Sequence, residues 1–488
     1  MPRSLKFAVL LAPVGLLAAC TVGPNYVAPA PPPPSAGYAS DGSGRAVLGS
    51  GPELAWWTAF ASPALDGLVE TALAHNHSLA ASKATLEKAR EHIRAVSGQG
   101  KPQVTANARA EYEQFNLSAF GLDSGFGSLG NPDFDLYTLG AGVTYDLDLF
   151  GKNRRMVEQA VAEAEAQQRQ TEAAHLLIAG RVTLQFLAIA ALNDRIRTEQ
   201  ALLTEDERNV SLTQARQRAG VGTLVEVLSA QGQGAADRTH LPQLQQQRAE
   251  ARSMLAVLLG ISPAELGATD YSLETIALPA KVPVAIPSEL VHKRPDIREA
   301  EARLHAATAA IGVATARLYP DISIGGTLTQ STSSPGKIFS TGSTGFDLFS
   351  GLLAPIFDGG TRKADKRGAQ DAARASAETY QQTVLEAFGQ VSTLLSALGS
   401  DQDSWAAQSR SAEIADRSLY LSRRSFQVGN SGILQVLDAS RAYQRAKLAQ
   451  VEARSRQYLD AARLMMATAG GWTGSDRPQV VATGTPAP

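Results

Sequence analysis

Cysteine, aromatic residues and long apolar runs are all scarce in this 488-residue sequence. Its one cysteine, Cys20, cannot form an internal disulfide bond. Aromatic residues make up only 6% of the chain, and the abundant alanine favours closely packed helices over a core of large side chains. Beyond the N-terminal segment no apolar run reaches the length of about 20 residues that a transmembrane helix needs. The formal net charge of -2 gives no reason to expect nucleic acid as a partner.

The N-terminus has the pattern of a secretory signal. Arg3 and Lys6 supply positive charge, and an apolar stretch follows from Phe7 to Ala18. The stretch ends at Cys20 in a sequence that resembles a bacterial lipobox, so residues 1–19 are predicted to be removed and Cys20 to carry lipid. A free cysteine after an ordinary signal peptide is the alternative. Thr21 follows, and the absence of an aspartate there favours the outer membrane.

Two segments are predicted to lie outside the folded repeats. Residues 20–60 are predicted to form a lipid-anchored linker, because the proline-rich stretch from Ala28 to Ser35 cannot pack a core. Residues 473–488 are predicted to be a flexible C-terminal tail.

The remainder of the chain contains a duplicated pattern. Three landmarks recur in the same order, with separations of 218, 208 and 209 residues: Pro102 and Pro320, Gly151 and Gly359, and Gly220 and Gly429. Such order at a nearly constant offset indicates two repeats, which we place at 61–285 and 286–472. We therefore predict an α+β membrane protein built from a duplicated unit of helix, strand, strand, long helix and helix.

The predicted elements of the two repeats correspond one to one. The first repeat has strands at about 103–115 and 137–150, a long helix at 156–218 and a helix at 225–259. The second has strands at about 321–331 and 344–357, a long helix at 362–427 and a helix at 433–468.

The predicted strands alternate apolar and polar residues. From Tyr137 to Leu149 one face is mainly apolar, whereas the other carries Thr, Gly and Asp. Roughly 10-residue strands of this kind are typical of a membrane β-barrel with a wet interior, although a half-buried strand of a soluble sheet has the same pattern. Four strands cannot close a barrel, and open sheet edges are not tolerated in lipid. A membrane location therefore requires several protomers to share one barrel.

The long helices have a coiled-coil-like seam. The segment from Met156 to Arg218 contains no proline and would extend about 95 Å at 1.5 Å per residue. Its apolar residues, including Leu203 and Val210, follow a repeat of about 3.5 residues. So elongated a chain is expected to have little core of its own and to bury these seams against copies of itself.

Several motifs resemble those of the outer-membrane factor family, the TolC-like proteins, and especially its NodT-type lipoproteins. The most specific is the stretch from Arg294 to Glu301, followed by Ala310 to Ala314; the ends of the two hairpins, Tyr145 to Gly151 and Pro355 to Gly360, also match. The resemblance covers essentially the whole mature chain. It implies a homotrimer with a shared 12-strand β-barrel in the outer membrane of a Gram-negative bacterium and a long α-helical barrel in the periplasm. It also implies a periplasmic adaptor protein and, through the adaptor, an inner-membrane pump.

The resemblance further implies roles for the turns after the long helices. These turns would be periplasmic tips that contact the adaptor, and they comprise Gly220, Val221, Gly222, Thr223, Gly429, Asn430, Ser431 and Gly432. Glycine also suits the positive-φ backbone of a tight helix exit, so geometry alone would explain it. Asp438 would form a ring of negative charge that acts as a gate. Gln435 stands where some members have a second acidic residue, and Asp438 could equally be a solvated helix charge.

No arrangement of residues indicates catalysis or a metal site. Gly125 to Gly130 fits a nucleotide-binding glycine pattern, but it lies in a loop between two strands and does not open a helix after a strand. His75 and His77 do not face the same way on a helix. We therefore expect no enzyme activity, no metal and no cofactor except the lipid on Cys20. The predicted function is an outer-membrane efflux or secretion duct; the alternatives are a structural periplasm-spanning coiled-coil lipoprotein and a lipid-anchored periplasmic enzyme.

Overall fold

The computed structural model describes residues 21–30, 38, 44–49, 51–114 and 133–470. The predicted signal, Cys20, the glycine-rich loop and the predicted tail lie outside these residues. The chain divides into two compact units, the first within 1–28, 87–166 and 301–379, the second within 29–86, 167–300 and 380–488. Each unit takes residues from both predicted repeats, so the compact units do not coincide with the sequence repeats.

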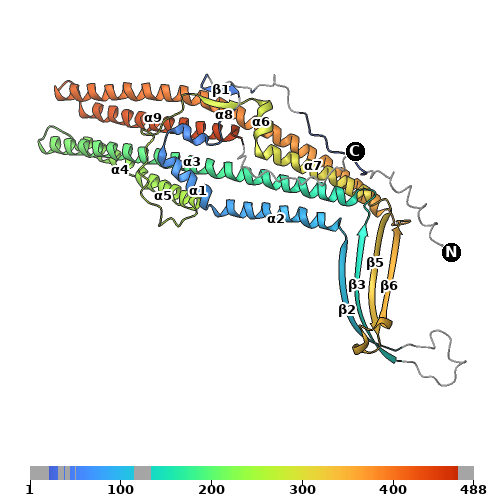
Figure 1. The fold of residues 1–488 in the computed structure, drawn as a ribbon. Helices are drawn as coiled ribbons and strands as arrows, with labels where there is room; N and C mark the ends of the chain where they lie inside the picture. The colour runs from blue at the N-terminus through green and yellow to red at the C-terminus, as the bar shows by residue number, and fades with distance from the viewer. Residues whose placement is uncertain (1–20, 31–37, 39–43, 50, 115–132, 471–488) are drawn as a thin grey trace. The chain divides into compact units, whose positions relative to one another are not determined.

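The order of elements repeats along the chain (Figure 1). The first half contains α1 (Pro63–His75), α2 (His77–Gln99), β2 (Gln103–Gln114), β3 (Asp133–Asp146), α3 (Lys152–Arg218), α4 (Leu224–Asp237) and α5 (His240–Leu259). The second contains α6 (Pro287–Lys293), α7 (Pro295–Ala316), β5 (Asp321–Thr332), β6 (Thr344–Leu353), α8 (Thr361–Gln427) and α9 (Ile433–Thr468).

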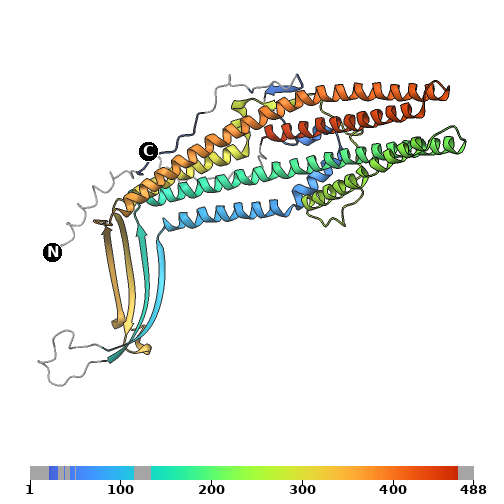
Figure 2. The same ribbon diagram turned by 180° about the vertical axis from the view of Figure 1, so that it is seen from behind.

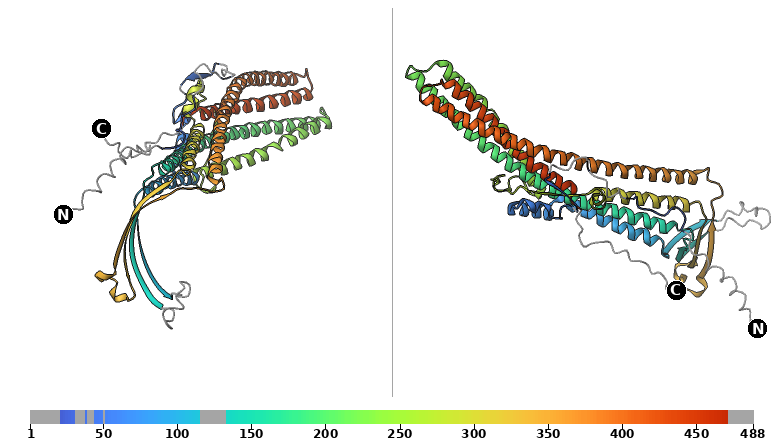
Figure 3. Two further views of the ribbon diagram at one scale, coloured as in Figure 1. Left: turned by 90° about the vertical axis from the view of Figure 1, so that its right-hand side faces the viewer. Right: turned by 90° about the horizontal axis from the view of Figure 1, so that it is seen from above.

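The first unit is built on one antiparallel sheet of four long strands in the order β2-β3-β5-β6. The pairing of β3 with β5 joins the two hairpins into a single sheet, which bends along its length (Figure 3). Among the described residues β2 pairs only with β3 and β6 only with β5, so both outer strands are open edges. Because the pairing is antiparallel, all four helix connections leave from the same end of the sheet.

Two strands end earlier than the sequence predicts. The second strand is predicted at 137–150, but β3 ends at Asp146, because Asp148 has a left-handed backbone with φ of 45°. The last strand is predicted to reach residue 357, but β6 ends at Leu353, two residues before Pro355. Proline has no backbone N–H to continue the ladder.

The helix predicted at 225–259 is wrong as a single element. It is interrupted at Arg238 and Thr239, between α4 and α5. Pro242 explains the break, because it has no N–H to bond the carbonyl four residues earlier and its ring crowds that carbonyl. The counterpart α9 has no proline and runs unbroken for 36 residues.

The second unit has a substantial core, which contradicts the expectation of little core within one chain. It combines residues of α1, α3, α5, β4, α8 and α9, and its fully buried side chains include Val182, Phe186, Leu255 and Leu395. One 18-residue window of α3 is apolar enough to cross a membrane, although no such run is predicted from the sequence. Half of that window is buried inside the structure.

The last part of the predicted linker is folded into the second unit. β1 (Ala46–Gly49) pairs in parallel with β4 (Val282–Ala285), and a short 3-10 helix (Trp56–Phe60) buries both tryptophans and the phenylalanine. The linker prediction is therefore wrong for 44–49 and 51–60. The three aromatic side chains explain why, since their burial stabilises a fold more than that of any other side-chain class.

Candidate functional site

The strand register aligns the apolar residues of all four strands on one face of the sheet. Ala141 of β3 stands opposite Ala106 of β2 and Leu328 of β5, and Leu328 stands opposite Phe346 of β6. The same face carries Val104, Ala108, Leu139, Val143, Ile322, Ile324, Leu348 and Leu352. These side chains are not covered: Val104 is 76% exposed and Leu348 is 83% exposed.

The other face of the sheet is mainly polar, although Phe134, Leu136, Phe349 and Leu353 also lie on it. It carries Thr105, Asn107, Arg109, Glu111, Thr138, Thr144, Ser323, Thr327, Thr329 and Asp347. Thr138 and Ser331 hydrogen-bond across the β3–β5 pair, and Thr327 donates to Asp347 across the β5–β6 pair. A sheet with one exposed apolar face and one polar face matches the wall of a water-filled membrane barrel.

Each hairpin is joined to its long helix through an aspartate cap. Asp148 accepts hydrogen bonds from the backbone N–H groups of Asn153, at 2.9 Å, and Arg154, at 3.1 Å. Asp358 accepts from those of Gly360, at 2.9 Å, and Arg362, at 3.1 Å. These backbone hydrogen bonds hold the pKa of Asp358 below its usual value. The duplication is thus visible in the chemistry of the two corners.

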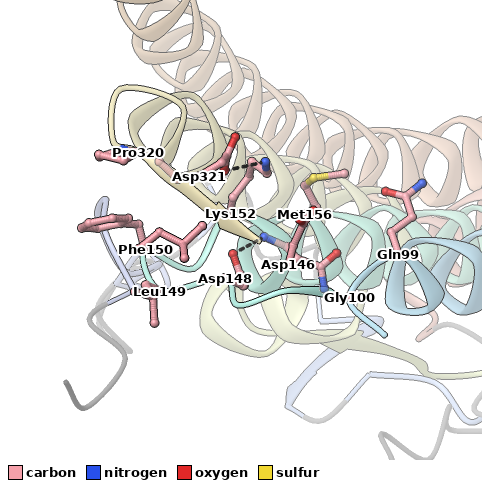
Figure 4. A pocket seen from close by; sticks show the side chains of 13 residues that line it. Gln99, Gly100, Asp146, Asp148, Leu149, Phe150, Lys152, Met156, Pro320 and Asp321 are labelled. Carbon is pink, nitrogen blue, oxygen red and sulfur yellow. Dashed lines mark hydrogen bonds and ion pairs between the residues drawn. The ribbon is translucent and has the colours of Figure 1, made fainter. Parts of the chain in front are cut away.

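A pocket of about 210 Å³ lies at the first corner (Figure 4). Three of its lining side chains are carboxylates, from Asp146, Asp148 and Asp321. Asp148 is engaged in the helix cap, and Lys152 forms an ion pair with Asp321 at 2.8 Å. The polar groups of the pocket thus stabilise the strand-to-helix corner and provide no acid–base pair for chemistry.

The turn after α3 is a Schellman motif. Gly220 has a φ of 72°, its N–H donates to the carbonyl of Gln217, and the N–H of Val221 donates to that of Arg216. Thr223 then caps α4 in a reciprocal capping box with Glu226. Gly222 is needed for a different reason, since a Cβ there would lie 2.9 Å from the Cβ of Arg216.

The turn after α8 repeats the exit but not the following cap. Gly429 has a φ of 79°, and the N–H of Asn430 donates to the carbonyl of Ser425 at 2.9 Å. Gly432 caps α9 with a φ of -82°, which any residue can adopt. The predicted need for glycine at a positive φ is therefore confirmed for Gly220 and Gly429 only.

The two turns lie side by side at one end of the second unit (Figure 2). Arg216 stacks over the ring of Phe426, and Arg423 forms an ion pair with Glu205 at 2.6 Å. Beneath them a small apolar cluster joins α4, α8 and α9, with Ala230, Leu419, Ile433, Val436 and Leu437 as its buried members. The contacts of Phe426 and Arg423 thus hold two hairpins together within one chain.

The predicted gate residues lie on the exposed side of α9, just after the second turn. Gln435 is exposed, and the side chain of Asp438 is 75% exposed and pairs with Arg441 at 3.2 Å. Val436 and Leu437 between them point into the apolar cluster. The structure thus separates the polar pair Gln435 and Asp438 from the core that supports them.

One buried carboxyl near the turns is not among the residues predicted from the sequence. Asp206 of α3 is only 4% exposed, and it accepts a hydrogen bond from Gln444 of α9 at 2.7 Å. The pKa of Asp206 is raised to about 6, mainly by burial and in smaller part by the nearby carboxyls of Asp237 and Glu199. A signal was present, because position 206 falls three residues after Leu203, on the apolar seam of α3.

Comparisons with known proteins agree with this arrangement. The family model "Outer membrane efflux protein" matches residues 68–261 and 286–470. The chain is 31% identical to the pyoverdine export outer membrane protein OpmQ of Pseudomonas putida, over 97% of this chain and 98% of OpmQ. It is 25% identical to SilC of Salmonella typhimurium, a probable outer membrane lipoprotein, over 94% of this chain and 97% of SilC.

A solved structure is similar over nearly the whole chain. The outer-membrane channel OprN superimposes with a TM-score of 0.84 at 29% identity, covering 93% of this chain and 100% of OprN. The resemblance found in the sequence is therefore confirmed, and the family is one of channel proteins rather than of enzymes. The chain belongs to the outer membrane efflux protein family, and it is the outer-membrane channel component of an efflux system.

Proposed function

We propose that the chain forms a homotrimeric exit duct, anchored in the outer membrane by lipid on Cys20 and fed from an inner-membrane pump through a periplasmic adaptor. The observation that carries this proposal is the exposed apolar face shared by β2, β3, β5 and β6. The spacer alternative has no use for such a face. Contact of these apolar side chains with lipid is favourable, whereas their exposure to water is unfavourable.

The open edges of the sheet support a shared barrel. The N–H and C=O groups on the outer sides of β2 and β6 need partners in lipid, where an unpaired backbone group costs several kcal/mol. A second copy of the chain can supply them by pairing its β6 with the first copy's β2. Three copies would contribute 12 strands, which suffices for a closed barrel with an aqueous interior.

The tips supply a surface for the adaptor. Val221, Leu224, Val225 and Val428 are exposed apolar residues at or beside the two turns. Apolar side chains gathered at one end of a protein indicate a contact with another protein. The predicted adaptor-contacting residues Gly220 to Thr223 and Gly429 to Gly432 lie in the same turns.

Asp438 supplies the charge of the gate. Three copies would place three exposed carboxylates around the axis of the helical barrel, where a ring of negative charge favours cations. Gln435 carries no charge, so this chain has one acidic ring at this end of α9. The ion pair with Arg441 within each protomer partly offsets the repulsion among the three carboxylates.

Single-channel conductance of the purified protein in a planar lipid bilayer tests the proposal. We expect discrete channels from the wild type and weaker cation selectivity from Asp438→Ala. Asp403→Ala removes an exposed carboxylate from α8 and should leave selectivity unchanged. If Asp438→Ala leaves conductance and cation selectivity unchanged, Asp438 is not part of the gate. Intact folded oligomers without conductance would contradict the duct.

A further inference from the structure

The first described residues of the chain, Thr21 to Tyr26, lie against the corner between β3 and α3. The N–H of Val22 donates to the carbonyl of Phe150 at 3.3 Å. Thr21 lies so close to Gly151 that a Cβ on this glycine would be 2.9 Å from the Cγ2 of Thr21. We call the segment Thr21–Tyr26 the latch.

Arg155, on the first turn of α3, binds the latch through hydrogen bonds to its oxygen atoms. Its Nε donates to the carbonyl of Val22 at 3.2 Å, and its Nη2 donates to the carbonyl of Gly23 at 3.3 Å and to the Oδ1 of Asn25 at 2.8 Å. Its Nη1 forms an ion pair with Glu158 at 2.6 Å. Arg155 is only 3% exposed, so these oxygens are what compensates the burial of its charge.

Glycines give the latch its close fit. Gly23 has a φ of 96°, and a Cβ on it would lie 2.5 Å from the Cα of Gly312 on α7. A Cβ on Gly312 would in turn lie 2.7 Å from the Cδ of Arg155. The latch, α7 and the guanidinium stem therefore touch at a place where no side chain can be accommodated.

An aromatic contact fixes the other end of the latch. The ring of Tyr26 stacks on that of His305 of α7, with 4.3 Å between centroids and 16° between planes. His305 also contacts Glu158 at 3.2 Å, so Arg155 and Tyr26 are connected through one carboxylate. The latch is thus held at both ends by α3 and α7 of the same unit.

We propose that this latch is a positioning device for the lipid anchor, with Arg155 as its positioning residue. The proposal rests on the lipidation of Cys20 set out above. Cys20 is joined to Thr21 by one peptide unit, which spans about 3.8 Å between Cα atoms. A docked latch therefore confines the acyl chains to the corner between β3 and α3, beside the sheet that must enter the membrane.

Confinement has a kinetic consequence for assembly. A short, docked tether keeps the membrane surface at a high effective concentration next to the sheet, whereas a free tether samples a larger volume. Undocking the latch should therefore slow insertion of the strands without preventing acylation.

Cross-linking between the latch and its site tests docking. Tyr26→Cys combined with His305→Cys is treated in isolated membranes with a short bismaleimide, and mass spectrometry measures the joined tryptic peptides. Acylation blocks Cys20, which leaves the introduced thiols as the reactive pair. We expect efficient cross-linking that Gly23→Ala and Arg155→Met each lower by roughly tenfold, the effect of about 1.4 kcal/mol of lost docking energy.

Gly44→Ala is the matched control, because Gly44 also has a positive φ, 76°, but open space around its Cβ position. It should cross-link like the parent pair. The cysteine pair replaces the stacked rings of Tyr26 and His305, so its latch is held by the contacts of Gly23 and Arg155 alone. Undiminished cross-linking with both Gly23→Ala and Arg155→Met would overturn the docking of the latch.

A second measurement separates the latch from lipidation itself. Metabolic labelling with palmitate reports acylation of Cys20, and the yield of heat-modifiable oligomer in outer membranes after a short pulse reports insertion. We expect Gly23→Ala to be acylated like the wild type but to give several-fold less oligomer. An unlabelled wild type would refute lipidation instead, and normal oligomer yield from an undocked but acylated variant would overturn the positioning role.

Discussion

The guanidinium of Arg216 on α3 lies over the ring of Phe426 on α8, with its Cζ 4.9 Å from the ring centroid. Each residue precedes a tight turn by about one helical turn, so this contact connects the two helical hairpins of one protomer at their ends. The carbonyl of Val221 also accepts a hydrogen bond from Arg216 at 2.9 Å, which ties the first turn to the same side chain. Any opening of the tips must either move both hairpins together or break this contact.

Arg216→Met and Phe426→Leu should destabilise the protein less in combination than the sum of the single changes. A cation over an aromatic ring contributes about 0.5–1 kcal/mol at an exposed site, and both replacements keep the apolar contact. The midpoint of thermal unfolding, followed by helical circular dichroism in detergent, measures the coupling. Arg218→Met should show no coupling with Phe426→Leu, and strictly additive effects for the Arg216 pair would contradict the interaction.

Gly429→Ala should lower the thermal midpoint more than Gly432→Ala, which only replaces a glycine N-cap by a poorer one. The left-handed backbone at Gly429 costs an L-residue about 1–2 kcal/mol, whereas Gly432 has an ordinary φ of -82°. A Cβ added at either position would meet no atom within 4 Å, so sterics are matched between the two variants. Equal midpoints for both variants would show that the turn relaxes without strain.

Asp206→Asn should stabilise the protein at neutral pH. Because burial raises the pKa of Asp206 to about 6, the folded state binds an extra proton between about pH 4 and 6, and the ionised carboxylate is costly above that window. The pKa rises from 3.8 to about 6, and one pKa unit corresponds to 1.36 kcal/mol, so the gain is on the order of 3 kcal/mol.

The thermal midpoints of the wild type and Asp206→Asn should converge as the pH falls toward 4. Glu199, Asp237 and His240 also lie around this site, and Asp403→Asn on the surface of α8 controls for a general effect of charge. A stabilisation that does not change with pH would argue that the carboxyl is not protonated in the folded protein.

Asp148→Ala should destabilise the first corner, whereas Asp148→Asn should be tolerated. Alanine removes the acceptor of two backbone N–H groups at the start of α3, and the loss of a helix cap costs about 1 kcal/mol of stability. Alanine also adopts the left-handed backbone of position 148, with its φ of 45°, less readily than aspartate does. Asparagine keeps an acceptor and adopts this backbone more readily. Proteolytic susceptibility of the corner measures the difference, and equal susceptibility of both variants would contradict the cap.

The long elements were predictable because their signal extends over many residues. The helix predicted at 362–427 is observed at Thr361–Gln427, and the one predicted at 433–468 is observed with those bounds. The alternation of the strands likewise predicted which residues share a face. These patterns are local, so one sequence suffices to read them.

Features that depend on distant residues were not predictable in this way. The pairing of β3 with β5 joins Val143 to Gly326, which are 183 positions apart, and no local pattern sets that register. The packing of Trp56, Trp57 and Phe60 into a core built by later helices is non-local for the same reason. Pro242 alone predicts the break between α4 and α5. The apolar residues keep their helical spacing on both sides of the break, so the pattern favoured one continuous helix.

The candidate site was predictable in its positions more than in its chemistry. The two turns lie where the glycines indicated, and the side chain of Asp438 is exposed, whereas its role as a gate stays a prediction. The side chains that connect the turns, Arg216 and Phe426, come from different repeats, so their contact follows only from the packing of α3 against α8.

The outer edges of β2 and β6 are unpaired among the described residues, so in the proposed barrel each copy would depend on an intact edge of its neighbour. A ring that closes edge to edge has no spare strand, so one copy with a damaged edge leaves one seam open, and one open seam is enough to break the ring. If half of the chains in a cell were defective in this way, random mixing would leave only about one ring in eight intact for a three-copy assembly. Edge-strand variants should therefore suppress export even when the normal chain is made in equal amount.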